Sequence, residues 1–538
     1  MASLARVTTT LYRRGRVRTP DDPFATALLV DGATVAWVGS EGAADAMSAD
    51  VTVELEDALL APAFVDAHVH ATSAGLALTG LDLTGSPSLS AALRTVEQAA
   101  RRGHGAVLLG TGWDDSAWPE GRPPTSAELD RASYGGVVYL ARTDVHSAVA
   151  SSALLASCPS ARGLRGFLPE GLVRAEAHAV VRRAAQEAVS RGQRRVAQRA
   201  TLDRAAALGI ACVHECGGPD LGGELDLLDL LDLEHGVERV GYWGELAGDG
   251  RDGVERDGVE RARELGAVGA GGDLFVDGAL GSHTAFLQRS YVDEPGHGHS
   301  YLDAAAIAQH VAACTLSGLQ AGFHAIGDAA LQAVVDGLDA AAEQVGDLRA
   351  CRHRVEHAEL LTSVQVLGLA RHGVVASVQP VFDARWGGPE GMYAGRLGAE
   401  RARGMNPFAA LAAAGVALAL GSDCPVTPLD PWGTVRAAVQ HRTSGSGLTA
   451  RAAFSAHTRG GRRAARDDDG GELLPGAPAT FAVWQVSGEL VVQIPDERVA
   501  GWSTDPRAAV AGLPDLDGPD PQCLRTVVRG ETVHLLGP

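Results

Sequence analysis

Residues 60–70 read Leu60-Ala61-Pro62-Ala63-Phe64-Val65-Asp66-Ala67-His68-Val69-His70, a short apolar run that ends in two histidines one residue apart. Side chains alternate between the two faces of an extended strand, so His68 and His70 leave the same face and can bind one metal ion. The pair is weak evidence alone, because the chain has 18 histidines and a chance pair on a wetted strand is a competing explanation. The rest of the chain has to decide between the two.

Three later segments share this design, an apolar strand-like run with a metal-ligand type of residue at its C-terminal end. They are Gly318-Leu319-Gln320-Ala321-Gly322-Phe323-His324, Arg352-His353-Arg354-Val355-Glu356-His357 and Gly415-Val416-Ala417-Leu418-Ala419-Leu420-Gly421-Ser422-Asp423. A parallel α/β barrel builds its active site at the C-terminal ends of its strands. A lone histidine there could equally be a satisfied core residue, but the segments taken together predict one shared site.

Further short motifs extend over nearly the whole chain. They are Ala67-His68-Val69-His70, Gly110-Thr111-Gly112-Trp113-Asp114, Pro123-Pro124-Thr125 with Leu129-Asp130, Thr143-Asp144-Val145-His146-Ser147, Phe275-Val276-Asp277-Gly278-Ala279-Leu280-Gly281-Ser282, His324-Ala325-Ile326-Gly327-Asp328, Glu356-His357-Ala358 and Gly421-Ser422-Asp423-Cys424-Pro425. This set resembles the amidohydrolase superfamily, and within it amidohydrolase family 3, typified by YtcJ-like proteins and N-substituted formamide deformylases. Gly-Ser-Asp alone would mean little, whereas His-x-His, Gly-Trp-Asp and Asp-Gly-Ala-Leu-Gly-Ser at these separations are jointly specific.

The resemblance implies an α/β fold with a metal-dependent (β/α)8 TIM-like barrel over residues 61–471. Both ends carry short β-like runs broken by turn residues, and the resemblance implies that residues 1–60 and 472–538 fold together as one composite β-sandwich. An inserted subdomain over residues 75–205, after the first barrel strand, is expected to be a lid or pocket wall, because long excursions from strand ends usually cover active sites.

Eight strand-like segments fit the barrel. One precedes His68, a second lies near Gly209, and two cover residues 239–244 and 273–277. Two more precede His324 and His357, and the last two cover residues 373–379 and 415–422. Within the insertion, residues from Ala175 to Ala207 are rich in Ala, Arg and Glu without proline and are predicted to be helical.

The chain contains no lysine, so all 46 residues in its Lys+Arg total are arginines. Relatives usually have a lysine before Asp-Gly-Ala-Leu-Gly-Ser, which can be carboxylated to bridge two metal ions; here Asp273 has that position. Aspartate is several bonds shorter, so it could substitute only if its strand lay closer to the metals. Glu215 is a second candidate bridge, and a loop role for Asp273 without catalytic function is the alternative.

The donor types imply a divalent metal, with zinc favoured and one or two ions left open. His68, His70, His324 and Asp423 supply nitrogen and oxygen donors that suffice for one zinc ion. His357 would bind a second ion or polarise the bound water or substrate. As in relatives, Asp423 is expected to accept the proton of the attacking water and pass it to the departing amine.

Candidate substrate-binding residues lie in the insertion and in the loop after Asp277. They are Trp113, Asp114, His146, Asp277 and His283. Core packing is the alternative for Trp113. Relatives commonly have arginine at the position of His283, and a histidine is no permanent bidentate anion clamp, which puts a carboxylate-bearing substrate in doubt.

The sequence therefore predicts a metal-dependent hydrolase that cleaves a non-peptide carbon–nitrogen bond of a small-molecule amide, an N-substituted formamide among them, through a metal-activated water. One alternative is hydrolysis of a cyclic amide or deamination on the same scaffold. Another is a catalytically weak, metal-containing small-molecule binder.

Composition excludes several other classes. A formal net charge of −20 disfavours nonspecific binding to nucleic acid or to an anionic membrane. The N-terminus lacks the apolar region of a secretory signal, and seven cysteines without a paired spacing indicate a reducing compartment. A thiolate metal site at Cys212, His214 and Cys216 is the less favoured interpretation of that strand. We expect a cytoplasmic enzyme, for which a homodimer is one possible assembly.

Overall fold

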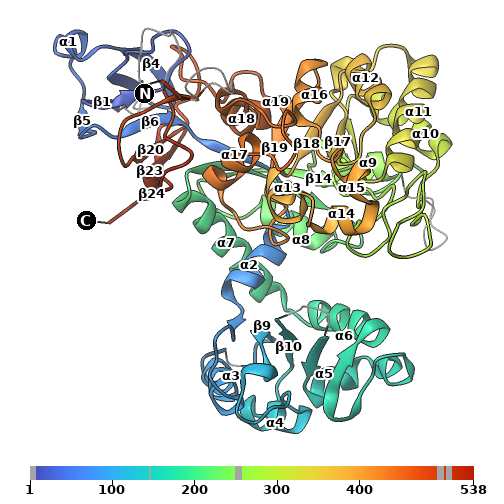
Figure 1. The fold of residues 1–538 in the computed structure, drawn as a ribbon. Coiled ribbons are helices and arrows are strands. Elements are labelled where there is room, and N and C mark those ends of the chain that lie inside the picture. The colour runs from blue at the N-terminus through green and yellow to red at the C-terminus, as the bar shows by residue number, and fades with distance from the viewer. Residues whose placement is uncertain are drawn as a thin grey trace. The chain divides into compact units, whose positions relative to one another are not determined.

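The chain folds into two compact units, one of residues 71–201 and one that combines residues 1–70 with residues 202–538 (Figure 1). The structure is a computed structural model that describes residues 8–103, 105–143, 147–248, 257–493, 502–503 and 512–537.

The larger unit is built on an eight-stranded parallel sheet in the order β19-β18-β17-β16-β15-β14-β13-β7. The strands are β7 (Phe64–Val69), β13 (Ile210–Gly217), β14 (Glu238–Trp243), β15 (Gly269–Ala270), β16 (Gln320–Ala325), β17 (Arg354–His357), β18 (Val375–Val378) and β19 (Ala417–Leu420). Val69 forms a parallel bridge to Cys424, and the Asp423 N–H donates to the His68 carbonyl at 2.8 Å. The sheet is therefore a nearly closed barrel, which confirms the predicted fold class.

Helices alternate with these strands. They are α8 (Glu224–Leu231), α9 (Gly258–Glu264), α10 (Ala304–Leu316), α11 (Asp328–Val345), α12 (Ser363–Arg371), α13 (Pro380–Trp386), α14 (Met392–Leu397), α15 (Ala399–Ala402), α16 (Phe408–Ala413), α17 (Pro431–Val439), α18 (Ala450–Ser455) and α19 (Gly461–Ala464). Local sequence explains their starts: Asp303 caps α10, and Thr362 with Gln365 forms a capping box at α12. Helices outside and side chains inside bury both faces of the strands, so every residue of β7 and β13 is buried.

The fourth barrel strand is interrupted where the sequence predicts a strand over residues 273–277. β15 covers only Gly269–Ala270, but beyond a turn Phe275 forms a parallel bridge to His324, and the Val276 N–H donates to the His324 carbonyl at 3.0 Å, so the prediction is confirmed in part. Gly272 follows β15 with φ of +83°, and a Cβ there would lie 3.1 Å from the Cβ atoms of Cys216 and Tyr242. The chain thus turns out of the sheet at Gly272, packed against β13 and β14, in a left-handed conformation that glycine adopts without strain.

Both chain ends contribute to the remaining sheets of this unit, as expected. Strands β1 (Thr9–Arg13), β3 (Ala27–Asp31), β4 (Thr34–Gly39) and β5 (Val51–Glu54) form one sheet, and α1 (Glu41–Ala44) follows β4. Strands β2 (Arg16–Val17), β6 (Leu59–Pro62), β20 (Phe481–Gln485), β23 (Gln522–Val528) and β24 (Glu531–Leu535) form another, and β21 (Val492–Gln493) pairs with β22 (Trp502–Ser503). β6 and β20 run antiparallel, so the second sheet joins the two ends of the chain.

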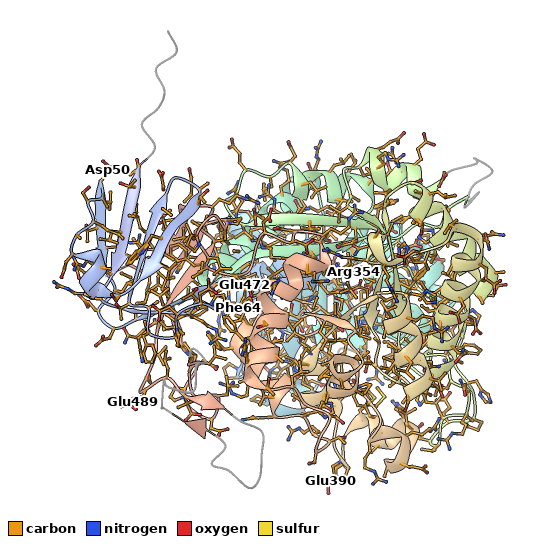
Figure 2. All side chains as sticks on the ribbon, turned by 90° about the horizontal axis from the view of Figure 1, so that it is seen from above. Asp50, Phe64, Arg354, Glu390, Glu472 and Glu489 are labelled. Atoms are coloured by element: carbon orange, nitrogen blue, oxygen red, sulfur yellow. The ribbon has the colours of Figure 1, made fainter. Side chains whose placement is uncertain are left out.

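Phe64, the first residue of β7, ties this sheet to the barrel. Its ring is fully buried and lies 5.1 Å from that of Trp432, 5.3 Å from Phe454 and 5.7 Å from Trp484. Figure 2 shows Phe64 and Arg354 within the ribbon, whereas Glu390 is exposed.

The smaller unit holds a separate five-stranded sheet in the order β12-β11-β10-β9-β8. Its elements are α2 (Ala71–Thr79), β8 (Leu81–Asp82), α3 (Leu89–Gly103), β9 (Leu108–Trp113), α4 (Ser126–Ala132), β10 (Val138–Arg142), β11 (Ser147–Ala150), α5 (Ser152–Ser157), β12 (Leu172–Arg174), α6 (Ala175–Glu187) and α7 (Arg191–Ala207), which ends in the larger unit. The helical stretch predicted from Ala175 to Ala207 is two helices, because Ser190 accepts hydrogen bonds from the Gln193 and Arg194 N–H groups and starts a new one. Among all described helices, none has both the length and the apolar character that a membrane span requires.

Candidate metal centre

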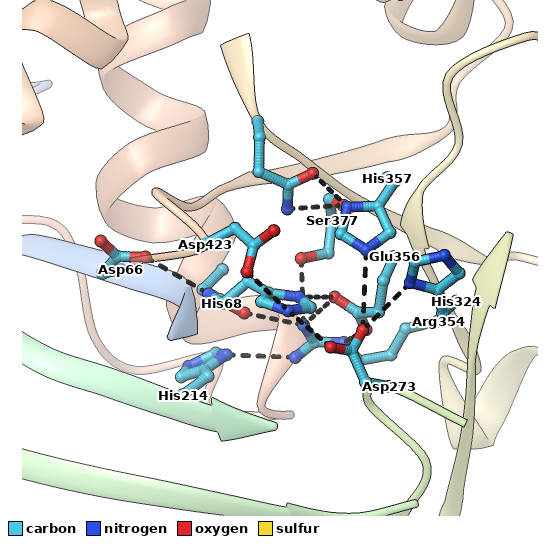
Figure 3. A network of polar contacts seen from close by, with 12 residues as sticks. Asp66, His68, His214, Asp273, His324, Arg354, Glu356, His357, Ser377 and Asp423 are labelled. Atoms are coloured by element: carbon cyan, nitrogen blue, oxygen red, sulfur yellow. Dashed lines mark hydrogen bonds and ion pairs between the residues drawn. The ribbon is translucent and has the colours of Figure 1, made fainter. Parts of the chain in front are cut away.

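Six side chains at the carboxyl ends of the barrel strands lie close together around Asp273, and we call them the ligand cluster; Figure 3 labels all of them except His70. They are His68 and His70 from β7, Asp273 after β15, His324 from β16, His357 from β17 and Asp423 after β19. All except His70 are at least nine-tenths buried.

Asp273 lies in the middle of the cluster. One carboxylate oxygen, Oδ2, is 3.5 Å from His68 Nε2 and 3.1 Å from His70 Nε2. The other, Oδ1, is 3.4 Å from His324 Nδ1 and 3.6 Å from His357 Nε2. The two oxygens therefore face two different pairs of histidines. The glycine turn at Gly272 explains how so short a side chain arrives there, because it brings the Asp273 backbone in from the sheet.

Asp423 completes the first of these groups. Its Oδ1 lies 3.6 Å from His68 Nε2 and 3.3 Å from His70 Nε2. Donor atoms of His68, His70 and Asp423 all lie within 4.8 Å of one another, as do those of His68, Asp273 and His357. Such spacing suits atoms that share a bound cation.

The cluster also holds polar atoms that nothing in the described part of the protein satisfies. His68 Nε2, His357 Nε2, both ring nitrogens of His324, Asp273 Oδ1 and Asp423 Oδ1 are buried there without a hydrogen-bond partner. Each such group costs about 1–3 kcal/mol unless something compensates. Nitrogen and carboxylate donors that face one point are what a zinc-type cation binds, so the cluster fits a metal site.

Hydrogen bonds on the far side of two imidazoles orient their metal-facing nitrogens. His68 Nδ1 donates to Glu356 Oε2 at 3.0 Å, and His357 Nδ1 donates to Gln379 Oε1 at 2.8 Å. Since Nδ1 carries the proton in both rings, the Nε2 lone pair of each faces the cluster. This arrangement is typical of metal-binding histidines.

Arg354 in turn holds Glu356. The guanidinium, which is fully buried, donates from Nε to Glu356 Oε1 at 2.7 Å and from Nη2 to Oε2 at 2.9 Å. Burial raises the pKa of Glu356, but the charge of Arg354 and the hydrogen bond from His68 outweigh it and hold that pKa well below its usual range. The sequence motifs alone predict no role for Arg354 or Glu356. The available signal was two opposite charges, one residue apart, on one face of a buried strand.

The same electrostatics keep Asp273 ionised. Burial alone would raise its pKa, but the nearby imidazoles, His68 foremost, lower it well below the ordinary value. Burial would lower the pKa of His70, and the carboxylates of Asp273 and Asp423 raise it instead. The central carboxylate is thus in the form that coordinates metal.

Two members of the cluster have strained backbones. His357 has φ of +68° and Asp423 has φ of +54°. Left-handed conformations cost non-glycine residues roughly 1–2 kcal/mol each. Strain of this kind gathers at functional sites, where the surrounding structure maintains it.

Glu215, the other candidate bridge, lies elsewhere. It stands in β13 between His214, whose Nδ1 contacts Arg354 Nη1 at 3.1 Å, and Cys216, whose thiol neighbours His68. Both neighbours face the barrel interior, so alternation directs Glu215 to the opposite face. Only Asp273 of the two candidates lies in the cluster.

Two predicted substrate-binding residues have structural partners in the loop after β15. Asp277 is fully buried, and its carboxylate accepts the N–H groups of Phe286 at 2.8 Å, Ile326 at 3.0 Å and Gly327 at 2.8 Å. His283 Nε2 lies 3.2 Å from Asp293. Asp277 therefore shapes the loop and offers no unoccupied oxygen to a ligand.

The other three predicted substrate-binding residues, Trp113, Asp114 and His146, belong to the smaller unit. Trp113 is buried in its core, where Nε1 donates to the Leu140 carbonyl at 2.9 Å, as the packing alternative expected. Asp114 accepts from the Ser116 N–H and forms an ion pair with Arg142 at 2.9 Å. His146 lies outside the described residues.

The sequence matches the model of the amidohydrolase family over residues 51–534. The chain belongs to this family. Within amidohydrolase family 3, this protein is 29% identical over 467 residues to "Protein LONG AFTER FAR-RED 3" of Arabidopsis thaliana, covering 80% of this chain and 77% of the relative. It is 26% identical over 418 residues to YtcJ of Bacillus subtilis, with 73% and 75% covered.

One further relative matches part of the sequence, and one solved structure matches the fold. This amidohydrolase is 33% identical over 148 residues to an N-substituted formamide deformylase of Arthrobacter pascens, a match covering 26% of this chain and 27% of that enzyme. The crystal structure of an uncharacterized metal-dependent hydrolase from Pyrococcus furiosus superposes with a TM-score of 0.72 at 24% identity, over 88% of this chain and 98% of that one. Family and cluster together make the protein a metal-dependent hydrolase of the amidohydrolase superfamily.

Proposed function

We propose that this protein hydrolyses a non-peptide carbon–nitrogen bond of a small-molecule amide with zinc as its metal, and that N-substituted formamides are among its substrates. The observation that carries the proposal is the ligand cluster, in which buried, unsatisfied imidazole and carboxylate atoms face one point. Formamides are favoured by the local similarity to a formamide deformylase.

We favour two zinc ions over one. His68, His70 and Asp423 would hold the first and His324 and His357 the second, with Asp273 between them in the place of the absent carboxylated lysine. The support is that each carboxylate oxygen of Asp273 faces its own pair of histidines. In the one-ion alternative, His357 polarises the substrate instead of binding metal.

When bound, a divalent cation of this kind lowers the pKa of water toward about 7 and polarises a carbonyl oxygen. Asp423 is positioned to take a proton from the attacking water as the water oxygen bonds to the amide carbon. The carboxyl group then delivers that proton to the nitrogen as the C–N bond breaks, which yields a carboxylic acid and an amine. Such proton transfer contributes roughly 10²- to 10⁴-fold to the rate.

Metal content per chain tests the centre. Protein purified without chelator is expected to hold about two zinc ions, falling to about one or none in Asp273→Ala. Glu343→Ala, an exposed acid on α11, is the matched control and should keep both. About one zinc, unchanged in Asp273→Ala, would establish the one-ion alternative, and a protein that binds no metal would overturn the proposal.

Product analysis tests the reaction. The zinc-loaded protein is expected to release formate from N-benzylformamide, and Asp423→Asn should slow this by about 10²-fold or more. Faster turnover of hydantoin, or ammonia release from a cyclic amidine, would assign the cyclic-amide or deaminase alternative. Metal binding without turnover of any of these would favour a small-molecule binder.

A further inference from the structure

A cavity of about 490 Å³ opens beside Asp273, at the carboxyl ends of β14 and β15. Apolar side chains form much of its wall, namely Leu221, Leu246, Leu274, Phe275 and Leu302. The Phe275 ring also lies 4.6 Å from that of His324. The cavity therefore continues from the ligand cluster into an apolar space large enough for an aromatic ring.

The charged residues among the described lining of this cavity are acidic. Asp220, Glu245 and Asp273 line it, and the described lining residues include no arginine or histidine. A ligand carboxylate placed beside Glu245 would lose its hydration and meet like charge. Like charges opposed across an interface are a common means of excluding wrong ligands.

Glu245 is the acid that stands out. The residue is only 5% exposed, and its Oε2 accepts the Trp243 indole N–H at 2.6 Å. The other oxygen has no hydrogen-bond partner among the residues that the structure describes. Because Glu245 lines the cavity, this oxygen can accept a hydrogen bond from a donor on a ligand there.

We propose that this cavity binds the apolar portion of the substrate and that Glu245 accepts a hydrogen bond from an N–H or ammonium group on it. The inference rests on the proposed function and names its substrate class: neutral or cationic apolar amides, in preference to amides bearing a carboxylate. Glu245 is thereby a specificity-determining residue, placed one strand away from Asp273.

Binding of product amines tests this without requiring turnover. Three ligands share one ring: 4-aminobenzoate is anionic, 4-aminobenzamide is neutral and of the same size, and 4-(aminomethyl)aniline carries an ammonium group. Their dissociation constants are measured by calorimetry on the zinc-loaded protein. We expect the benzamide and the ammonium ligand to bind at least about 10-fold more tightly than the benzoate, the size typical of one charge-assisted contact.

The Glu245→Gln variant isolates the carboxylate, because glutamine keeps the shape and can still accept the Trp243 N–H. The ammonium ligand is expected to lose about 10-fold or more in affinity, while the neutral benzamide changes less than about 3-fold. Glu343→Gln on α11 is the matched surface control and should change neither.

The outcomes separate this inference from the hydrolase proposal. If the protein binds the benzamide and the ammonium ligand more tightly than the benzoate but cleaves no amide, the cavity assignment is supported and the proposed hydrolase reaction is overturned. Benzoate binding equal to or tighter than benzamide binding, in the wild-type protein, would overturn the cavity assignment whatever the activity, as would an absence of binding by all three ligands.

Discussion

At the scale of single residues, Arg354 and Glu356 show how the barrel interior serves the metal centre. Both are fully buried, and Arg354 also donates to the Ala67 carbonyl at 2.8 Å and to Ser377 Oγ at 3.0 Å. Such a pair is weak evidence for stability, because hydrophobic replacements often do as well. Its clearer effect is on His68, whose ring Glu356 orients.

We therefore expect Glu356→Gln to weaken zinc binding about 10- to 100-fold, measured by competition with a chromogenic chelator, because loss of an oriented outer carboxylate has this effect at histidine metal sites. Unfolding free energy should also fall by about 3–5 kcal/mol, since Arg354 keeps an unpaired buried charge.

A double variant separates the two effects. Arg354→Met with Glu356→Gln removes both charges, so it should recover much of the stability but none of the zinc affinity. Recovery of zinc affinity together with stability would mean that Glu356 acts only through folding.

His310, a buried residue outside the ligand cluster, is expected to make the protein less stable at acid pH. Its Nδ1 accepts the Ala247 N–H at 3.0 Å and its Nε2 donates to the Ala270 carbonyl at 3.0 Å, so the folded protein needs the neutral ring. Burial lowers the pKa of His310 from 6.5 to about 4, and the hydrogen bond to the Ala270 carbonyl and the charge of Asp257 oppose this less.

Above pH 6.5 His310 is neutral in the folded and unfolded chains and adds no pH dependence. Between pH 6.5 and about 4 only the unfolded chain takes up the proton. The free energy of unfolding therefore decreases as the pH is lowered, by on the order of 3 kcal/mol in total. Thermal midpoints measured across this range should decline less steeply in His310→Gln than in wild type. His299→Gln, at an exposed position, is the control, and an equal decline in all three proteins would contradict the assignment.

At the scale of elements, the two-residue strand β15 and the turn after it decide where the central carboxylate lies. Gly272→Ala would place a methyl group 3.1 Å from Cys216 and Tyr242 in a left-handed backbone, and should displace Asp273. We expect lower stability, by about 1 kcal/mol or more, and loss of bound zinc.

Gly266 provides a close control for that variant. It follows α9 with φ of +74°, and an added Cβ would meet nothing within 4 Å. Gly266→Ala should pay the same backbone cost of about 1 kcal/mol while keeping its zinc. If Gly272→Ala also kept its full zinc content, the turn would not control the position of Asp273.

At the scale of the whole molecule, the sheet joined from both chain ends is packed onto the start of β7. Trp484 is 1% exposed and contacts Phe64, at the opposite end of β7 from His68. Trp484→Ala should therefore lower the unfolding free energy by about 3–5 kcal/mol through cavity formation, while the folded variant keeps its zinc content.

Denaturant unfolding followed by tryptophan fluorescence, with metal analysis of the folded fraction, measures both quantities. Phe24→Ala, at a side chain that is 54% exposed, should cost far less. Loss of zinc from well-folded Trp484→Ala would show that the joined sheet shapes the metal centre directly.

By itself, the sequence determined the α/β barrel and five members of the ligand cluster. His68, His70, His324, His357 and Asp423 could be recognised because each stands at the end of an apolar run, a local pattern that strand alternation and barrel topology bring to one edge. The same local reasoning held only in part for residues 273–277: Phe275 pairs with His324 as a strand residue does, but the backbone conformation of Gly272 turns the chain out of the sheet just before Asp273.

Only the tertiary structure decided what the remaining side chains do. The central position of Asp273, the support of His68 by Glu356 and the structural roles of Asp277 and Trp113 all depend on partners far away in the chain. Burial and pairing are properties of the packed molecule: an acid becomes a candidate ligand, a loop anchor or the wall of a cavity according to which donors surround it.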